Sequence, residues 1–128
     1  MKYDEYETER SRRRRQICMV EVDGRMVCID PSLPLFSELG KKYTMTILTI
    51  LKHKEEGINF NQIIRFIPFS STAIISRRLK ELAGMGLIEK LNNGEHVIYR
   101  LTEFGNELSE LIVPLMHLAE IHYGVNSE

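Results

Sequence analysis

Residues 70–90 constrain the fold of this chain more than any other part of the sequence. The segment opens with hydroxyl residues that can cap a helix, continues with an apolar stripe, and reaches two glycines before a short apolar run. The stripe is formed by Ile75, Leu79 and Leu82, whose i, i+4, i+7 spacing predicts one buried helical face. The sequence therefore predicts a helix, a glycine stop and a strand in direct succession.

The opposite face of this predicted helix has a different chemistry. In a DNA groove, small residues near the start of a helix face base edges, and cations further along face phosphates. Such a face therefore favours insertion into DNA. Its outward residues are Ala73, Arg77, Lys80 and Gly84, with Ser76 beside them.

The distribution of charge along the chain supports this interpretation, although the net charge of −1 argues against a nucleic-acid binder. Residues 10–100 hold 16 Lys and Arg against 9 Asp and Glu. Residues 101–128 hold five Glu and neither Lys nor Arg, and residues 1–9 hold four acids and one Lys. We therefore expect a basic middle that contacts phosphate and acidic ends with other roles.

The length of 128 residues predicts one compact domain with its own core. The sequence has no apolar run as long as a membrane span, and its charged start does not resemble a secretory signal. We therefore expect a cytoplasmic protein without a membrane partner. The sequence also lacks a glycine-rich phosphate loop, a nucleophile elbow and a zinc motif, so we expect neither an enzyme nor a cofactor or metal site.

Residues 1–30 are predicted to form an extension of the domain. An arginine run at 12–15 indicates an arm that contacts phosphate or, equally, a solubilising tail. Two β-rich runs around Asp23 and Gly24 predict a hairpin over residues 17–30.

The middle of the chain is predicted to be mainly helical. One long helix is expected from Pro34 to residues 52–56, and a short strand at 58–60 leads to a second helix through Ile67. The helix of residues 70–90 is the third.

Two strands and a final helix complete the prediction. The strands are expected at 87–91 and 96–100, and a last helix from Thr102 to about residue 122. The fold class is therefore α+β, mainly α. It is a winged helix-turn-helix over residues 31–102, with an N-terminal β-hairpin over 1–30 and a C-terminal dimerisation helix over 103–128.

Three runs, at residues 76–82, 85–90 and 99–105, resemble winged-helix transcriptional regulators of bacteria and archaea. Within this MarR-like group the chain most resembles the HxlR type, in which a Gly-Lys-aromatic pattern begins the first helix and is matched here at residues 40–43. Two departures are that the Cys often found before that helix is replaced by Asp-Pro, and that residues 1–30 lie outside the resemblance.

The resemblance implies a homodimer on a palindromic double-stranded DNA operator, with one recognition helix for each half-site. It places Ser71, Ala73, Ile74 and Arg77 against bases. An intramolecular salt bridge is an equal alternative for Arg78, which lies near the core boundary. The full set of residues that it assigns to DNA is Ser70, Ser71, Thr72, Ala73, Ile74, Arg77, Arg78, Lys80, Lys90, Asn92, Asn93 and Gly94.

The last helix has too many apolar residues for a single buried stripe. One side can cover the core, and we expect the other to meet the same helix of a second subunit. The alternative is that residues 1–30 fold back over it. The residues predicted to mediate dimerisation are Leu108, Leu111, Ile112, Leu115, Met116 and Ala119.

The two cysteines, Cys18 and Cys28, are the remaining candidates for chemistry. With Val22 opposite Arg25 they lie on opposite faces of the hairpin, so free thiols are favoured over a disulfide. Two other functions stay open: a thiol-responsive regulator that uses both cysteines, and a winged-helix module that binds proteins in a transcription or repair assembly. The sequence does not identify a small-molecule effector.

Overall fold

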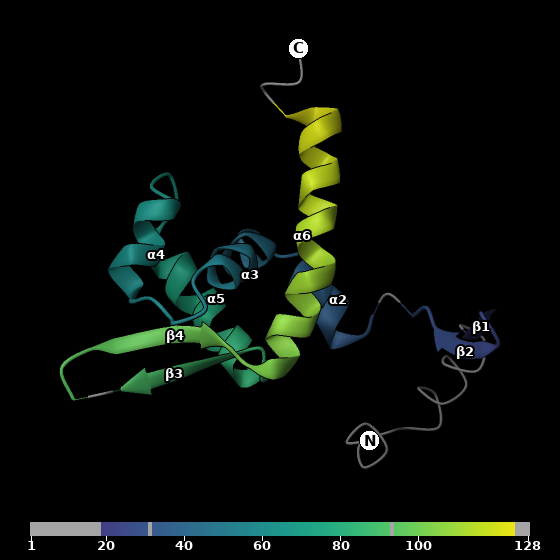
Figure 1. Cartoon of the computed structure of the whole chain (residues 1–128), viewed down its shortest axis with the longest axis horizontal. Coiled ribbons are helices and arrows are strands. Elements are labelled where there is room, and N and C mark those ends of the chain that lie inside the picture. The colour runs from purple at the N-terminus through teal and green to yellow at the C-terminus, as the bar shows by residue number, and fades with distance from the viewer. Residues whose placement is uncertain (1–18, 31, 93, 125–128) are drawn as a thin grey trace. The chain divides into compact units, whose positions relative to one another are not determined.

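The chain forms two compact units that divide between Gly40 and Lys41. The computed structural model describes residues 19–30, 32–92 and 94–124 (Figure 1). In the described residues, the first unit contains a hairpin and a short helix, and the second contains four helices and two strands. The fold is thus α+β and mainly α, as predicted.

The hairpin of the first unit has the predicted register. Strand β1 (Met19–Val22) pairs antiparallel with β2 (Arg25–Cys28), and the residues on either side of the turn face each other. Asp23 and Gly24 have φ angles of 51° and 79°. Because both angles are positive, they fit the two-residue turn that joins twisted strands without splaying them.

The single long helix predicted from Pro34 is wrong, because the structure has two helices there. Helix α2 (Pro34–Leu39) is followed by Gly40 at its C-cap, and α3 (Thr44–His53) begins after Tyr43. Tyr43 has a φ angle of 73°, a left-handed conformation that interrupts a right-handed helix. Apolar residues keep a helical spacing on both sides of the break, so periodicity alone does not reveal it.

Helix α3 supplies the centre of the second unit's core. Its buried side chains pack beneath α6, where the Ser109 hydroxyl donates to the Leu48 carbonyl over 3.5 Å. Full burial of a side chain of this size stabilises the fold by about 1.5–3 kcal/mol. The buried apolar residues of the unit are Ile47, Leu48, Leu51, Ile58, Ile63, Ile67, Ile75, Leu79, Leu82, Leu87, Ile88, Leu108 and Ile112.

Helix α4 (Phe60–Phe66) begins with a reciprocal capping box. The Asn59 side chain accepts from the Gln62 backbone, and the Gln62 side chain accepts from the Asn59 backbone, each over 2.9 Å. The short strand predicted at 58–60 is reduced to one bridge, in which Ile58 pairs with Tyr99. The bridge fixes the α3–α4 loop to the second of the two strands described next.

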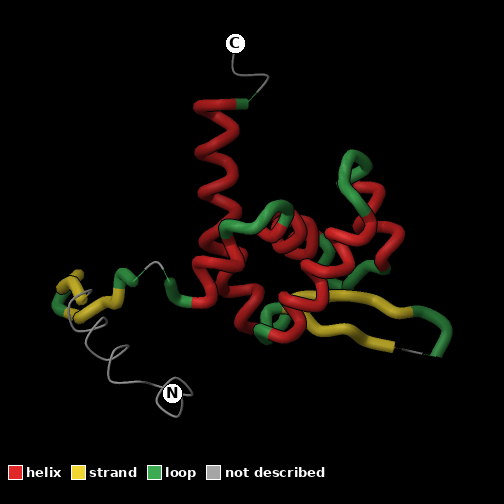
Figure 2. Tube along the Cα trace, turned by 180° about the vertical axis from the view of Figure 1, so that it is seen from behind, coloured by secondary structure: helices red, strands yellow, loops and turns green. Residues whose placement is uncertain are grey.

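Helix α5 (Thr72–Gly84) follows α4 across a short turn, which completes the predicted helix-turn-helix. Strands β3 (Ile88–Asn92) and β4 (Val97–Leu101) form the antiparallel wing (Figure 2). Both strands lie one residue further along than predicted. The reason is that Leu87 still belongs to the turn that closes α5, where its N–H donates to the Leu82 carbonyl over 3.0 Å.

Helix α6 (Glu103–Tyr123) begins at the predicted cap, since the Thr102 hydroxyl oxygen accepts from the Gly105 N–H over 3.0 Å. Gly105 packs directly on the backbone where the wing begins. A Cβ atom at this position would lie 1.9 Å from the Leu87 carbonyl oxygen. The start of α6 therefore fits the base of the wing so closely that a side chain at Gly105 has no room.

Candidate nucleic-acid interface

Helix α5 has the two faces that its sequence predicts. Ile75, Leu79 and Leu82 are at most 2% exposed. Among the described residues, no carboxylate forms an ion pair with Arg77 or Lys80. The outward face is therefore both positively charged and accessible to a ligand. Its exposed residues are Ala73, Arg77, Lys80 and Gly84, with Ser76 half-buried.

The hydroxyl residues at the start of α5 differ in what they can contact. The Ser70 hydroxyl donates to the Ile67 carbonyl over 2.7 Å, so it closes the turn after α4. Ser71 occupies the N-cap position without a side-chain capping hydrogen bond, and Thr72 is exposed. Ile74, predicted to face bases, is half-buried at the edge of the helix.

Arg78 is held within the chain by the salt bridge that the sequence left open. Its Nη1 lies 2.8 Å from Glu81 Oε1, and its Nε donates to the Lys42 carbonyl over 3.0 Å. Its side chain is only 13% exposed. The assignment of Arg78 to a DNA contact is therefore not supported, because the guanidinium already has its partners inside the fold.

Glu81 joins two segments of the second unit through two cations. The hydrogen bond from Lys41, together with the one from Arg78, lowers the pKa of the Glu81 carboxyl group below its ordinary value, although burial opposes the shift. Glu81 therefore stays ionised at neutral pH and connects the segment before α3 to α5.

The described residues of the wing differ in what they can contact. Lys90 is exposed and forms no ion pair with a described carboxylate. The Asn92 side chain accepts from the Gly94 N–H over 2.9 Å, so it shapes the turn, where Gly94 has a φ angle of 96°. Asn93 lies outside the described residues. Across the strands Arg100 pairs with Glu89, which leaves Lys90 as the cation of the described wing strands that has no carboxylate partner.

Helix α6 divides the predicted dimerisation residues into two sets. Leu108 and Ile112 are 9% and 3% exposed and pack in the chain's own core, so their assignment to a subunit interface is wrong. In the second set, Leu111 and Leu115 belong to an exposed apolar stripe along one side of α6, with a spacing of i, i+4, i+7 and i+10. Met116 is half-buried and Ala119 is exposed. The stripe consists of Leu111, Leu115, Leu118 and Ile121, with exposed fractions of 73%, 52%, 53% and 51%.

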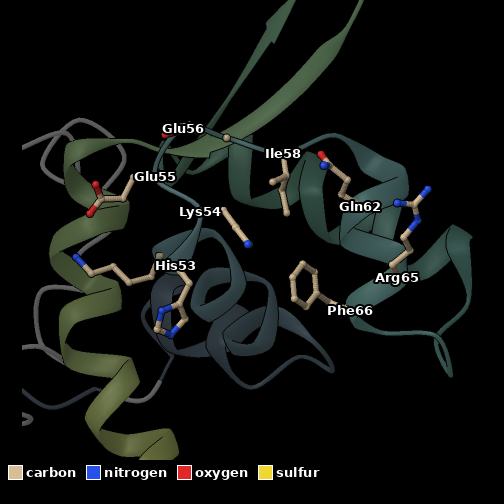
Figure 3. Close-up of a pocket in the computed structure, with 10 residues that line it drawn as sticks. His53, Lys54, Glu55, Glu56, Ile58, Gln62, Arg65 and Phe66 are labelled. Atoms are coloured by element: carbon tan, nitrogen blue, oxygen red, sulfur yellow. The ribbon is translucent and has the colours of Figure 1, made fainter.

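A cavity of about 900 Å³ lies between the end of α3, the following loop and α4 (Figure 3). Lys54 Nζ is 5.8 Å from the centre of the Phe66 ring, and Arg65 lies beside them. Glu55 and Glu56 line the opposite part of the cavity. Since charges of both signs surround it and it is open to solvent, its lining does not favour one class of ligand.

The structure describes one of the two cysteines and allows a search of the described residues for a metal site or a membrane span. Cys28 is a half-buried free thiol, and Cys18 lies outside the described residues. Across residues 19–30, 32–92 and 94–124, no three His, Cys, Asp or Glu side chains gather where they could hold a metal ion. No helix among them is long and apolar enough to cross a membrane.

Sequence reasoning missed a group of residues that lie against α5. Lys41 and Lys42 bind Glu81 and Arg78 of this helix. The Tyr43 ring lies 6.0 Å from the ring of Phe69, which precedes the helix. The sequence signal for this group is the Gly-Lys-aromatic pattern at 40–43, which by itself indicates only the start of a helix.

Comparison with known proteins agrees with this arrangement. A family model described as HxlR-like helix-turn-helix matches residues 38–126. Comparison with curated proteins gave no significant match.

Several solved structures are similar to the chain. A possible HxlR family transcriptional factor from Thermoplasma volcanium is 38% identical, with a TM-score of 0.73 over 80% of this chain and 94% of that chain. The reduced form of the transcriptional regulator YodB from B. subtilis is 30% identical, with a TM-score of 0.62 over 75% and 94%. The quinone-bound form of YodB is 31% identical, with a TM-score of 0.58 over 67% and 91%.

Proposed function

The chain belongs to the HxlR-like helix-turn-helix family, a family of transcription factors and not of enzymes, and from this premise we propose that it binds specific double-stranded DNA as a homodimer. Helix α5 enters the major groove of each half-site. The wing contacts the neighbouring backbone, and α6 joins the two subunits.

The observation that carries this proposal is the accessible positive charge on the outward face of α5. Arg77 and Lys80 are exposed without carboxylate partners in the described chain, while the neighbouring Arg78 is held by Glu81. Small Ala73 lets the start of the helix approach base edges. The helix thus separates cations that are available to DNA from one that supports the fold.

The chemistry of these residues assigns them different roles in the proposed complex. Arg77 can bind a guanine edge through two hydrogen bonds, and the Ser71 and Thr72 hydroxyl groups can contact either bases or phosphates. Lys80 and Lys90 are point charges that favour phosphate oxygens. Base contacts at the start of α5 therefore provide specificity, and the two lysines provide salt-dependent affinity.

The exposed apolar stripe of α6 supports the homodimer. Leu111, Leu115, Leu118 and Ile121 keep one side of the helix, and the helix carries no Lys or Arg. A second copy of the same helix can cover this stripe across a two-fold axis. A two-fold axis also matches the symmetry of a palindromic operator.

The test is equilibrium DNA binding by the purified chain. A duplex is selected from a random library and labelled, and its binding is followed by fluorescence anisotropy between about 50 and 200 mM salt. We expect affinity for the selected duplex about 1,000-fold or more above that for a scrambled one, and a linear fall of log affinity with log salt. The alternative, a protein-interaction module with apolar contacts, predicts no selected sequence and little dependence on salt.

A further inference from the structure

We propose that a second surface beside α5, formed by Lys42, Tyr43 and Phe69, contacts the DNA backbone along one edge of the recognition helix. We call these three residues the α5 flank. The inference rests on the proposed function, since it adds a backbone contact to the same protein–DNA complex. No part of the flank belongs to the recognition helix or to the wing.

Three contacts fix the flank to the recognition helix and to the turn before it. Lys41 pairs with Glu81 of α5, and the Lys42 carbonyl accepts from Arg78 Nε over 3.0 Å. The Tyr43 and Phe69 rings lie 6.0 Å apart at an angle of 51°. Because these contacts involve consecutive residues before α3, the flank has a fixed place relative to α5.

The pattern of residues on α5 shows on which side the flank lies. Ile74, Arg78 and Glu81 follow an i, i+4, i+7 spacing and form one edge of the helix, between its buried and outward faces. Arg78 and Glu81 of this edge hold the flank. Arg77 is on the outward face directly beside it. A helix in the major groove has a phosphate backbone along each edge, so the flank faces one of the two backbones.

The flank is held in an unusual conformation and leaves an aromatic ring uncovered. Tyr43 adopts a φ angle of 73°, which costs a residue other than glycine about 1 kcal/mol or more. Phe69 is 76% exposed, although Ile67, two residues earlier, is fully buried. Strain of this kind, held by surrounding contacts, occurs at binding sites.

The chemistry of the flank fits a sugar-phosphate backbone. The Lys42 ammonium forms no ion pair with a described carboxylate and lies 5.1 Å from the centre of the Tyr43 ring. The ring directs the exposed cation without neutralising it, so a phosphate can still bind there. Phe69 beside it offers an apolar surface for a deoxyribose ring. The partner is therefore DNA backbone, which is contacted without regard to base sequence.

The test compares Lys42→Gln with Lys54→Gln on the selected duplex and on a scrambled duplex. Lys54 is the matched control because it also lies over an aromatic ring, that of Phe66 (Figure 3). It follows α3, at the opposite end of that helix from Lys42, and its loop pairs with β4 through Ile58. Each protein is titrated over the same salt series. A Lys42→Arg variant restores the charge.

We expect Lys42→Gln to reduce the slope of log affinity against log salt by about 0.9 for each phosphate that the variant no longer neutralises, equally on both duplexes. Lys42→Arg should recover the slope, and Lys54→Gln should keep the parental slope. Phe69→Ala should weaken binding several-fold without changing the slope.

If Lys42→Gln keeps the parental slope while the parent binds the selected duplex, the proposed contact between the flank and the DNA backbone is wrong and the proposed function stands. If the parent shows no salt-dependent binding, the proposed function fails, and this inference fails with it.

Discussion

Helices α5 and α6 bury one face in the same core but expose faces of opposite character. Helix α5 has three cations and one acid, and its outward face is polar and positive. Helix α6 has four glutamates, neither lysine nor arginine, and an exposed apolar stripe. Their buried faces follow the same spacing and carry no information about partners. The exposed faces differ, because the positive charge of α5 suits a polyanion such as DNA, and a second copy covers the apolar stripe of α6 in the proposed dimer.

The largest expected effect concerns two glycines, one at the end of α5 and one at the start of α6. Gly105→Ala places a Cβ atom 1.9 Å from the Leu87 carbonyl oxygen, whereas a Cβ at Gly84 meets no atom within 4 Å. We expect Gly105→Ala to lower the free energy of unfolding by about 4 kcal/mol, and Gly84→Ala to leave it unchanged or raise it by up to about 1 kcal/mol. Urea unfolding followed by circular dichroism, at equal protein concentrations, measures both. Equal stabilities for the two variants would show that α6 does not need its close contact with the wing.

The next effect tests the exposed face of α6. Leu115→Glu introduces a charge into the stripe, and we expect it to weaken the dimer by about 3 kcal/mol, roughly 100-fold in dissociation constant. Sedimentation velocity over a concentration series measures the association. Glu120→Gln, a polar change elsewhere on the same helix, is the control and should leave the dimer intact. A dimer that resists Leu115→Glu would mean that another surface joins the subunits.

A substitution on the exposed face of α5 should change DNA binding and not the association of the subunits. Arg77→Ala should weaken binding to the selected duplex by about 1–3 kcal/mol and reduce discrimination at one position of each half-site. It should leave the oligomeric state unchanged, whereas Leu115→Glu should change it. Anisotropy on a set of single-base variants of the duplex measures the loss. A uniform loss across all sequences would make Arg77 a phosphate contact instead.

The smallest effect concerns Glu81, the one acid of α5. Because its pKa is lowered in the folded state, its ion pairs stabilise the fold above the ordinary pKa of a glutamate, and this contribution is lost as the pH falls through the lowered value. We expect Glu81→Gln to reduce the free energy of unfolding at pH 7 by less than about 1 kcal/mol. The difference from the parent should shrink as the pH falls below the ordinary pKa of a glutamate. Thermal unfolding at several pH values measures it, and a difference that grows on acidification would contradict the assignment.

Much of the fold follows from the sequence because helical spacing and turn residues are local signals. The stripe of Ile75, Leu79 and Leu82 and the Asp23-Gly24 turn gave the recognition helix and the hairpin register. The break at Tyr43 could not be predicted in this way, since it depends on one φ angle that tertiary contacts hold.

The candidate interface was less accessible to prediction. The salt bridge of Arg78 with Glu81 is an i, i+3 pair within α5, but the other partner of Arg78, the Lys42 carbonyl, lies thirty-six residues earlier in the chain. On α6 the spacing identified too many apolar residues but not which of them are buried, so Leu108 and Ile112 were assigned to the wrong surface. The Lys42 contact of Arg78 and the burial of Leu108 and Ile112 both depend on elements that are distant in sequence.

The close contact of Gly105 with Leu87 has a consequence for the operator itself. Since the start of α6 cannot slide on the base of the wing, in the proposed dimer the separation of the two recognition helices is set by how the two α6 helices cross. The protein then fixes the distance between the two half-sites that it can bind at once. One additional base pair between the half-sites would rotate one of them by about 35° about the duplex axis, and the DNA, not the protein, would have to twist to accommodate it.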